Sequence, residues 1–230
     1  PYISDTTDVL EQLKQIKKDS CIITDVGSVK KTIHDVVSEL NLGDCFIGGH
    51  PMAGSEKTGL SNASEYLLEN AYYIISPTAK TRKEDLEDMR TFVASLGAIP
   101  LVLDYNTHDH ATAAISHLPH IIAYSLVNLV KDLDDNQETM KTIAAGGFRD
   151  LTRIASSSPI MWEQICVTNH ENISELLGKY IESMQEIKDS LDSVCGQDIY
   201  DLFEESRDYR NSITGVSHGP IKKAYALYVD

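Results

Sequence analysis

The chain has 230 residues, of which 42% are hydrophobic and 24% charged, so it can bury the core of one large or two small domains. It carries 35 acidic but only 20 basic residues, and the formal charge of −15 argues against nucleic acid and anionic membranes as partners. An acidic ligand would therefore need a local cationic site. The four cysteines lie far apart without a CxxC motif, which predicts reduced thiols in a cytoplasmic protein and no metal site. No apolar run approaches the length of a membrane span.

The sequence begins and ends within segments that look like parts of secondary-structure elements. The sequence starts at Pro1 with a strand-like segment and stops at Asp230 within an apolar pattern. An α/β dinucleotide-binding domain usually has G-x-G-x-x-G between its first strand and first helix, and this sequence has no such motif. We therefore expect the chain to be part of a longer protein, with the first βαβ unit outside it.

The first 104 residues alternate between helical and strand patterns. Apolar residues at helical spacing predict helices over 6–18, 29–40 and 81–96, and short apolar runs predict strands over 21–25, 44–50, 71–76 and 98–103. This alternation predicts a mainly parallel sheet with helices on its faces. The loops at Ser28 and His50 then lie at the same edge of the sheet.

Beyond residue 104 the strand pattern disappears. Thr107 is a possible N-cap of a long helix, and Pro119 is expected to kink that helix. The Gly146-Gly147 pair predicts a helix break, and Ser158-Pro159 predicts a helix start. Helical patterns cover residues 109–130, 136–154, 158–194 and 199–212.

These patterns predict two domains. Residues 1–104 form an α/β part that is an incomplete, mainly parallel Rossmann-like domain, and residues 105–230 form an all-helical domain. The apolar content of residues 109–130 and 158–194 exceeds what a small helical layer can bury alone. We therefore predict a homodimer through the helical domain.

The most distinctive segment is GGHPMAGSEKTG, residues 48–59, which follows the predicted strand 44–50. Glycines let the backbone approach a ligand closely, and Pro51 keeps His50 out of helical geometry. A histidine at the carboxyl end of a strand lies where α/β sheets bind their ligands, and its near-neutral pKa suits proton transfer. His50 is therefore the first candidate for a catalytic residue.

The long helix of the second domain carries further histidines. His110 and His117 are seven residues apart, so a regular α-helix would place them on one face. His120 alone is interpreted as a half-buried core residue. Trp162 is the only tryptophan and follows the predicted helix start; a single tryptophan more often belongs to a core or an interface than to a ligand site.

A candidate anion site follows the glycine pair. Asp150 and Arg153 are three residues apart and can pair on one helical turn, although such spacing more often belongs to a solvated surface pair. A guanidinium group is always charged and binds carboxylates through two parallel hydrogen bonds. Arg153 is therefore a candidate for binding a substrate carboxylate.

Taken together, these motifs resemble prephenate dehydrogenases, and the resemblance runs from the first residues to about Arg210. Any one of the motifs would be a weak signal, but five in the same order are specific. They are DVGSVK at 25–30, GHPMAGSEKTG at 49–59, SHLPH at 116–120, GFRDLTRIA at 147–155 and PIMW at 159–162.

The resemblance implies a Rossmann-like NAD-binding domain and a helical dimerisation domain. It also implies NAD-dependent oxidative decarboxylation of prephenate to 4-hydroxyphenylpyruvate in tyrosine biosynthesis, by a cytoplasmic homodimer. The departure from the family pattern is the missing phosphate-binding glycine loop, without which this chain is expected to lack full activity.

The resemblance also implies roles for individual residues. His50 accepts a hydrogen bond from the C4 hydroxyl of the substrate, and Ser28 holds that hydroxyl or the imidazole. The other implied site residues are Arg153 on a substrate carboxylate, Asp150 orienting Arg153, His117 beside the substrate side chain, Ser55 and Glu56 at the mouth of the site, Trp162 from the partner subunit, and Gly54 with Ser28 at the cofactor.

Three other interpretations remain open. Arogenate, the amino analogue of prephenate, is a possible substrate. A hydroxy-acid dehydrogenase on a similar scaffold would need a catalytic lysine in the helical domain, and the sequence offers no convincing candidate. A non-catalytic dimerisation or sensing module would leave His50, Ser28 and Arg153 without a purpose.

Overall fold

The computed structural model describes residues 5–214 apart from residue 19, residues 55–63 and residue 65. Packing divides the chain into two compact units, Pro1–Leu177 and Gly178–Asp230. The sequence places a domain boundary after residue 104, where the strand pattern ends. That boundary rests on secondary structure and not on packing, and it stays a prediction.

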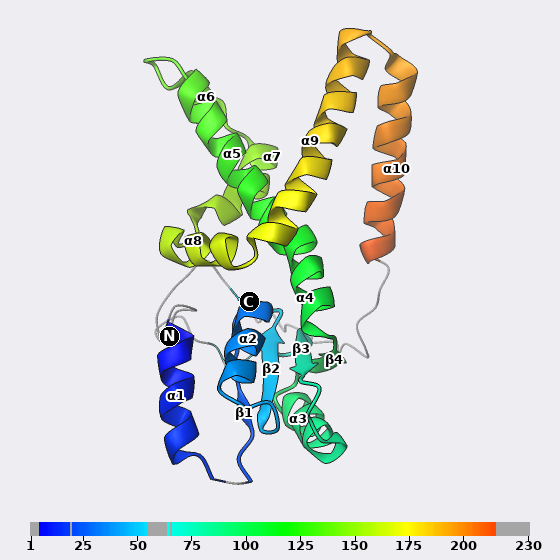
Figure 1. The fold of residues 1–230 in the computed structure, drawn as a ribbon. Coiled ribbons are helices and arrows are strands. Elements are labelled where there is room, and N and C mark those ends of the chain that lie inside the picture. Colours follow the sequence, from blue (N-terminus) through cyan, green and yellow to red (C-terminus); the bar gives the residue numbers. More distant parts are fainter. Residues whose placement is uncertain (1–4, 19, 55–63, 65, 215–230) are drawn as a thin grey trace, which may run out of the picture. The chain divides into compact units, whose positions relative to one another are not determined.

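The first unit begins with an α/β part, as predicted. Its elements are α1 (Thr6–Ile16), β1 (Ile23–Thr24), α2 (Lys31–Glu39), β2 (Phe46–Pro51), β3 (Tyr72–Pro77), α3 (Lys83–Ser95) and β4 (Ile99–Val102) (Figure 1). The strands form one sheet in the order β1-β2-β3-β4. β1 is parallel to β2 and β3 is parallel to β4, whereas β2 and β3 run antiparallel with His50 opposite Ile74. The sheet is therefore mainly parallel, which confirms the predicted fold class.

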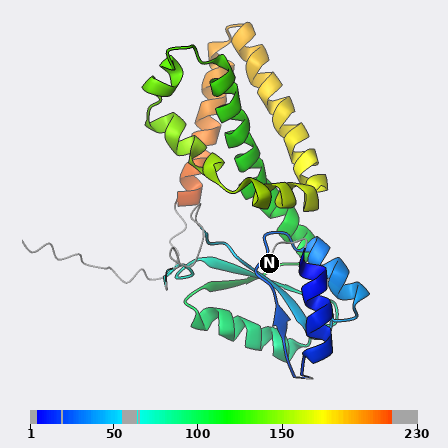
Figure 2. The ribbon, with the colours of Figure 1, turned by 90° about the vertical axis from the view of Figure 1, so that its left-hand side faces the viewer.

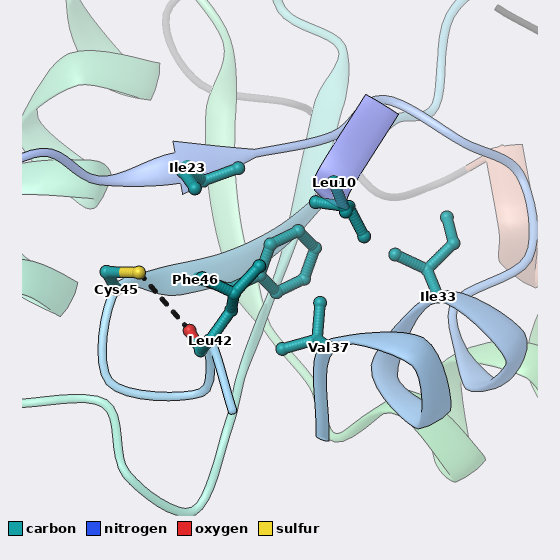
Figure 3. Close-up of a cluster of buried hydrophobic side chains, with 7 residues drawn as sticks. All are labelled: Leu10, Ile23, Ile33, Val37, Leu42, Cys45 and Phe46. Atoms are coloured by element: carbon teal, nitrogen blue, oxygen red, sulfur yellow. Dashed lines mark hydrogen bonds between the residues drawn. The ribbon is translucent and has the colours of Figure 1, made fainter. Parts of the chain in front are cut away.

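Neighbouring residues of β2 build the cores on the two faces of the sheet, because side chains alternate along a strand. Phe46, 1% exposed, packs with side chains of α1 and α2, among them Leu10 and Val37 (Figure 3). Ile47, also 1% exposed, packs on the opposite face with Val93 of α3. Figure 2 shows α1 and α2 on one side of the sheet and α3 on the other. Burying each such side chain stabilises the fold by about 1.5–3 kcal/mol.

A continuous helical run leads out of the sheet: α4 (Tyr105–Thr112), a π-helical segment (Ala113–His117) and α5 (Leu118–Leu133). The N-cap is Asp104, whose carboxylate accepts the backbone N–H groups of Asn106 and Thr107 at 3.0 and 3.1 Å. The prediction of Thr107 as the cap is therefore wrong, because the carboxylate of Asp104, three residues earlier, accepts these N–H groups.

Close to Pro119, where the sequence predicts a kink, the helical run contains the π-helical segment, which ends just before α5 begins. The kink itself stays a prediction. Pro119 lies in the first turn of α5, where the N–H that proline lacks is least needed. The wider π turn also changes the helical register, so His110 is exposed while His117 is 1% exposed. The prediction that these two histidines share one face is wrong for this reason.

Shorter helices follow: α6 (Thr139–Ile143), α7 (Gly146–Thr152), a 3₁₀ turn (Arg153–Ser156), α8 (Pro159–Thr168) and the start of α9 (His170–Asp192). The break predicted at the glycine pair falls just before it, since α7 starts at Gly146. Pro159 starts α8 as predicted. The helix predicted over 158–194 is interrupted at Asn169, whose side-chain amide donates to the Asp109 carbonyl oxygen of α4 and lies 3.2 Å from Nδ1 of His117 in the π-helical segment.

The second unit holds the rest of α9 and α10 (Gly196–Thr214). Side chains from both helices, including Ile187 and Leu202, line a cavity of about 190 Å³ between them. The two helices therefore pack side by side as a helical hairpin.

The run Tyr105–Leu133 has 29 residues and a mean hydropathy of 1.4, which would suffice for a membrane span by length and composition alone. It is the one such candidate in the part of the chain that the structure describes, and the expectation that no apolar run approaches this length is wrong for it. The run also contains the buried polar side chains of His108, Asp109 and His117, and ionisable groups are costly inside a bilayer. An apolar helix face of this kind equally suits packing against a second protein chain.

We expect Gly49→Ala to destabilise the protein, because a Cβ atom there would lie 2.5 Å from the Asp25 carbonyl oxygen and 2.6 Å from the Tyr73 hydroxyl. Overpacking of this kind costs about 1–3 kcal/mol. Gly147→Ala in α7 is the matched control, since no atom lies within 4 Å of its added Cβ. Urea unfolding of both variants tests this prediction, and equal midpoints for Gly49→Ala and the wild type would contradict it.

Candidate active site

A cavity of about 460 Å³ lies where the carboxyl end of β2 meets the π-helical segment and α8. Six of the residues proposed from the sequence line this cavity: Ser28, His50, Gly54, His117, Arg153 and Trp162. Asp150 is exposed and is not among the lining residues. Ser55 and Glu56 lie outside the described residues. The structure thus brings together most of the predicted site from segments that are far apart in sequence.

A second cavity of about 440 Å³ lies between α1, α2 and α8. Its lining is mainly threonine and aliphatic side chains, with Glu163 as the one ionisable group. The cavity beside His50 is therefore the better candidate for proton chemistry.

The strand end that carries His50 is fixed by a buried ion pair. Lys30 is completely buried, pairs with the carboxylate of Asp25 and donates a hydrogen bond to the Gly49 carbonyl oxygen at 2.8 Å. Asp25 in turn accepts the Gly49 N–H at 3.0 Å. Burial lowers the pKa of Lys30, while the nearby charge of Asp25 opposes that effect. The pair holds both backbone groups of Gly49, so the residue before His50 is fixed.

The imidazole of His50 is bonded to a second histidine. Its Nδ1 lies 2.7 Å from Nε2 of His108, and Nδ1 of His108 lies 2.7 Å from the Asp109 carboxylate. His108 and Asp109 are 0% and 1% exposed. The Asp109 carboxylate also accepts the backbone N–H groups of Lys30 and Lys31, both at 2.8 Å, at the first turn of α2. Asp109 therefore caps α2 from a distant part of the chain.

Burial keeps the cavity histidines neutral near pH 7. Burial lowers the pKa of His50 to about 3, and the neighbouring His108 and Lys30 add to the shift. Burial also lowers the pKa of His117 to about 4, against the opposing charge of Asp109. A neutral imidazole has one bare nitrogen, so each of these side chains can accept a hydrogen bond.

Aromatic rings form one wall of the cavity. Trp162, 7% exposed, stacks on His120 with 3.7 Å between ring centroids and meets His117 edge-on at 5.9 Å. The indole N–H has no hydrogen-bond partner among the described residues. Trp162 lines the cavity of its own chain. Its presence at the site therefore does not require a partner subunit. His120 is half-buried, as its interpretation from the sequence expects, and it also lines this cavity.

Arg153 supplies the permanent positive charge among the described lining residues. It is exposed and lies on the 3₁₀ turn after α7. The ion pairs of the described residues do not include the expected one between Asp150 and Arg153, because α7 ends between the two residues. A cationic rim beside neutral imidazoles suits an anionic ligand that gives up a proton.

Sequence reasoning did not single out His108, Asp109 and Lys30. Lys30 belongs to the DVGSVK motif but is fully buried instead of solvated. His108 and Asp109 are adjacent in sequence and start the same helical run as the SHLPH motif. An adjacent His-Asp pair at the start of a helix after the last strand is the signal that would have identified them.

Known protein families match the chain along most of its length. A family model described as "Prephenate dehydrogenase, nucleotide-binding domain" matches residues 2–101, and one described as "Prephenate dehydrogenase, dimerization domain" matches residues 104–205. The prephenate dehydrogenase of Bacillus subtilis (strain 168) is 39% identical over 210 residues. The match covers 91% of this chain and 57% of that relative, so the chain spans less than two thirds of its length.

Solved structures agree with these matches. A crystal structure of prephenate dehydrogenase from A. aeolicus, in complex with hydroxyphenyl propionate and NAD+, superposes with a TM-score of 0.86 at 30% identity; it covers 93% of this chain and 74% of that one. The crystal structure of Synechocystis arogenate dehydrogenase superposes with a TM-score of 0.82 at 29% identity, covering 92% and 76% of the two chains.

We expect the free energy of unfolding to fall as the pH drops from about 6.5 toward 5, because unfolded histidines bind protons there while folded His50 and His117 remain neutral. The contribution of each rises to about 1.4 kcal/mol per pH unit as the unfolded histidine becomes fully protonated. Urea unfolding across this range measures the slope. His50→Asn and His117→Asn should each reduce it by about one proton, and an unchanged slope in both variants would contradict the assignment of neutral histidines.

Proposed function

Because the chain belongs to the prephenate dehydrogenase family, we propose that it acts in the NAD-dependent oxidative decarboxylation of prephenate to 4-hydroxyphenylpyruvate. The observation that carries this proposal is the shared cavity of His50, a half-buried neutral imidazole, and Arg153, a guanidinium. The substrate needs both groups, since it loses a hydroxyl proton and carries carboxylates. The B. subtilis relative and the A. aeolicus complex support the same activity.

The residues present fit the reactive end of the dinucleotide. Ser28 and Gly54 follow β1 and β2 at the carboxyl edge of the sheet and line the cavity, and an added Cβ at Gly54 would meet no atom within 4 Å. The G-x-G-x-x-G motif for the phosphates is not in the sequence. When bound, NAD+ would take up the hydride from C4 of the substrate.

His50 would accept the proton of the C4 hydroxyl as the hydride departs. Carbon dioxide then leaves from the ring carboxylate, its bonding electrons enter the ring, and the ring becomes aromatic. The pKa of about 3 describes the cavity without substrate. A bound dianion favours the protonated imidazole and raises that pKa, so His50 becomes a better base when substrate is present. The Ser28 hydroxyl on the same cavity wall would orient the substrate hydroxyl or the imidazole.

The remaining lining residues would position the substrate. Arg153 would bind a carboxylate, His117 would lie beside the side chain, and Trp162 would cover the ring. The described geometry gives Asp150 no contact with the cavity, so we do not assign it the role of orienting Arg153 within one chain.

Arogenate is the second candidate substrate, because the Synechocystis neighbour is an arogenate dehydrogenase. The two substrates differ only in their side chains, and assays with each substrate at equal concentration distinguish them. A hydroxy-acid dehydrogenase finds less support, since no lysine is among the described residues that line the cavity. A purely structural module would not explain the cavity of His50, Ser28 and Arg153.

In a full-length version of the protein, we expect His50→Asn to lower kcat for prephenate by about 10²–10⁴-fold, the scale of a positioned base, with little change in KM. Steady-state formation of NADH measures this effect. His110→Asn is the control, because His110 is exposed and outside the cavity lining. Equal kcat values for His50→Asn and the wild type would remove His50 from the mechanism.

We expect Arg153→Ala to raise KM for prephenate by about 10- to 150-fold, because it removes a charge-assisted contact with a carboxylate. The effect on kcat should be smaller if the contact is equally strong in the ground and transition states. Arg153→Lys should restore only part of the affinity, since lysine keeps the charge but not the two parallel bonds. An unchanged KM in Arg153→Ala would contradict this role for Arg153, and Arg149 would be the next residue to test.

The assembly that we propose is a cytoplasmic homodimer formed through the helical part. Several helices expose large apolar side chains that a monomer leaves in water, and the matching family model is that of a dimerization domain. Examples are Leu129 of α5 at 55%, Ile181 of α9 at 59% and Phe203 of α10 at 70% exposure. Sedimentation at micromolar concentration should give a dimer, and a stable monomer there would contradict this proposal.

A further inference from the structure

Asp109, His108 and His50 form a chain of hydrogen bonds. The donor and the acceptor of each bond in this chain follow from the contacts of Asp109. Both Asp109 oxygens accept backbone N–H groups at the start of α2, where the helix dipole favours a negative charge. The carboxylate therefore has no proton to offer to His108. The 2.7 Å contact between the two side chains then requires a proton on Nδ1 of His108.

The second contact follows from the first. A neutral His108 with its proton on Nδ1 has a bare Nε2, which must accept. The 2.7 Å contact with His50 then requires a proton on Nδ1 of His50. A neutral His50 in this tautomer has a bare Nε2, the nitrogen left free to act as an acceptor in the cavity.

We propose that His108 and Asp109 are positioning residues that hold His50 in the tautomer with its proton on Nδ1, so that Nε2 is the acceptor. Neither residue is assigned to touch the substrate. The proposal rests on the proposed function in one respect, that this bare nitrogen receives the substrate proton.

The arrangement also stabilises His50 after the proton has moved. When Nε2 accepts the hydroxyl proton, His50 becomes an imidazolium whose Nδ1–H continues to donate to His108. No further proton moves along the chain. The Asp109 carboxylate on the far side of His108 favours the positive charge through an environment that excludes water, since both residues are almost completely buried.

The two positions differ as targets for mutation. Asp109 also caps α2, so its removal combines two effects. His108 has no such second role in its side-chain contacts, which makes it the cleaner test. His108→Phe keeps the ring volume but has no nitrogen. In His108→Gln the amide oxygen can accept from His50 while the amide N–H₂ donates to Asp109, so the tautomer should be retained without a second imidazole.

The test is nitrogen NMR of ¹⁵N-histidine-labelled protein near pH 7.5, with the His50 signals identified by their loss in His50→Asn. We expect His50 to carry its proton on Nδ1 in the wild type and in His108→Gln, and to shift toward the Nε2–H form in His108→Phe. His110→Phe, a matched change at an exposed position of the same helix, should leave the signals unchanged. If His108 were protonated, it would donate to Nδ1 of His50, and the proton of His50 would lie on Nε2. Finding wild-type His50 in that form overturns the proposal.

An unchanged tautomer in folded His108→Phe would also overturn it, and near-ultraviolet circular dichroism reports the folding of each variant. If His108→Phe does not fold, the wild-type tautomer still decides. In turnover, His108→Phe should lower kcat about 10- to 100-fold, as when an outer partner of a functional histidine is removed, and His108→Gln should restore part of it. The NMR result needs neither prephenate nor NAD+, so a full-length version of the protein with the expected tautomer but no such turnover would refute the proposed function alone.

Discussion

The carboxylate of Asp109 connects three parts of the molecule that are separate in sequence. It caps α2, it holds His108, and through His108 it reaches His50 at the end of β2. It is almost completely buried, and its charge is compensated by backbone N–H groups of the helix and by an imidazole N–H. Since the helical run and the α/β part meet at this carboxylate, the geometry of the cavity depends on it.

The second constraint is the tight end of β2. The pair of Lys30 and Asp25 holds both backbone groups of Gly49, and the two glycines before His50 leave no room for larger residues. Burial disfavours the charged form of His50, and the nearby His108 and Lys30 add to this effect, so His50 stays neutral. The protein has an overall charge of −15. Its cavity, in contrast, combines a neutral base with an exposed, positively charged arginine.

Sequence reasoning predicts the α/β part well, because buried strands and amphipathic helices such as 81–96 carry strong local periodicity. It also finds His50 and Arg153 through motifs. It misses what depends on distant contacts: His50 and His108 are 58 residues apart, and Lys30 and Asp109 are 79 apart. The π-helical segment that separates the faces of His110 and His117 has no signal in a pattern built on 3.6 residues per turn.

The central claim is that the cavity beside His50 receives a hydroxyphenyl or cyclohexadienyl acid with its ring oxygen on the imidazole. A crystal structure of the protein with hydroxyphenyl propionate, the ligand of the A. aeolicus structure, tests this most directly. We expect the ring hydroxyl to lie within hydrogen-bond distance of His50 Nε2 and the carboxylate to lie on the side of Arg153. A ligand bound between α1, α2 and α8, or with its carboxylate against His50, would contradict it.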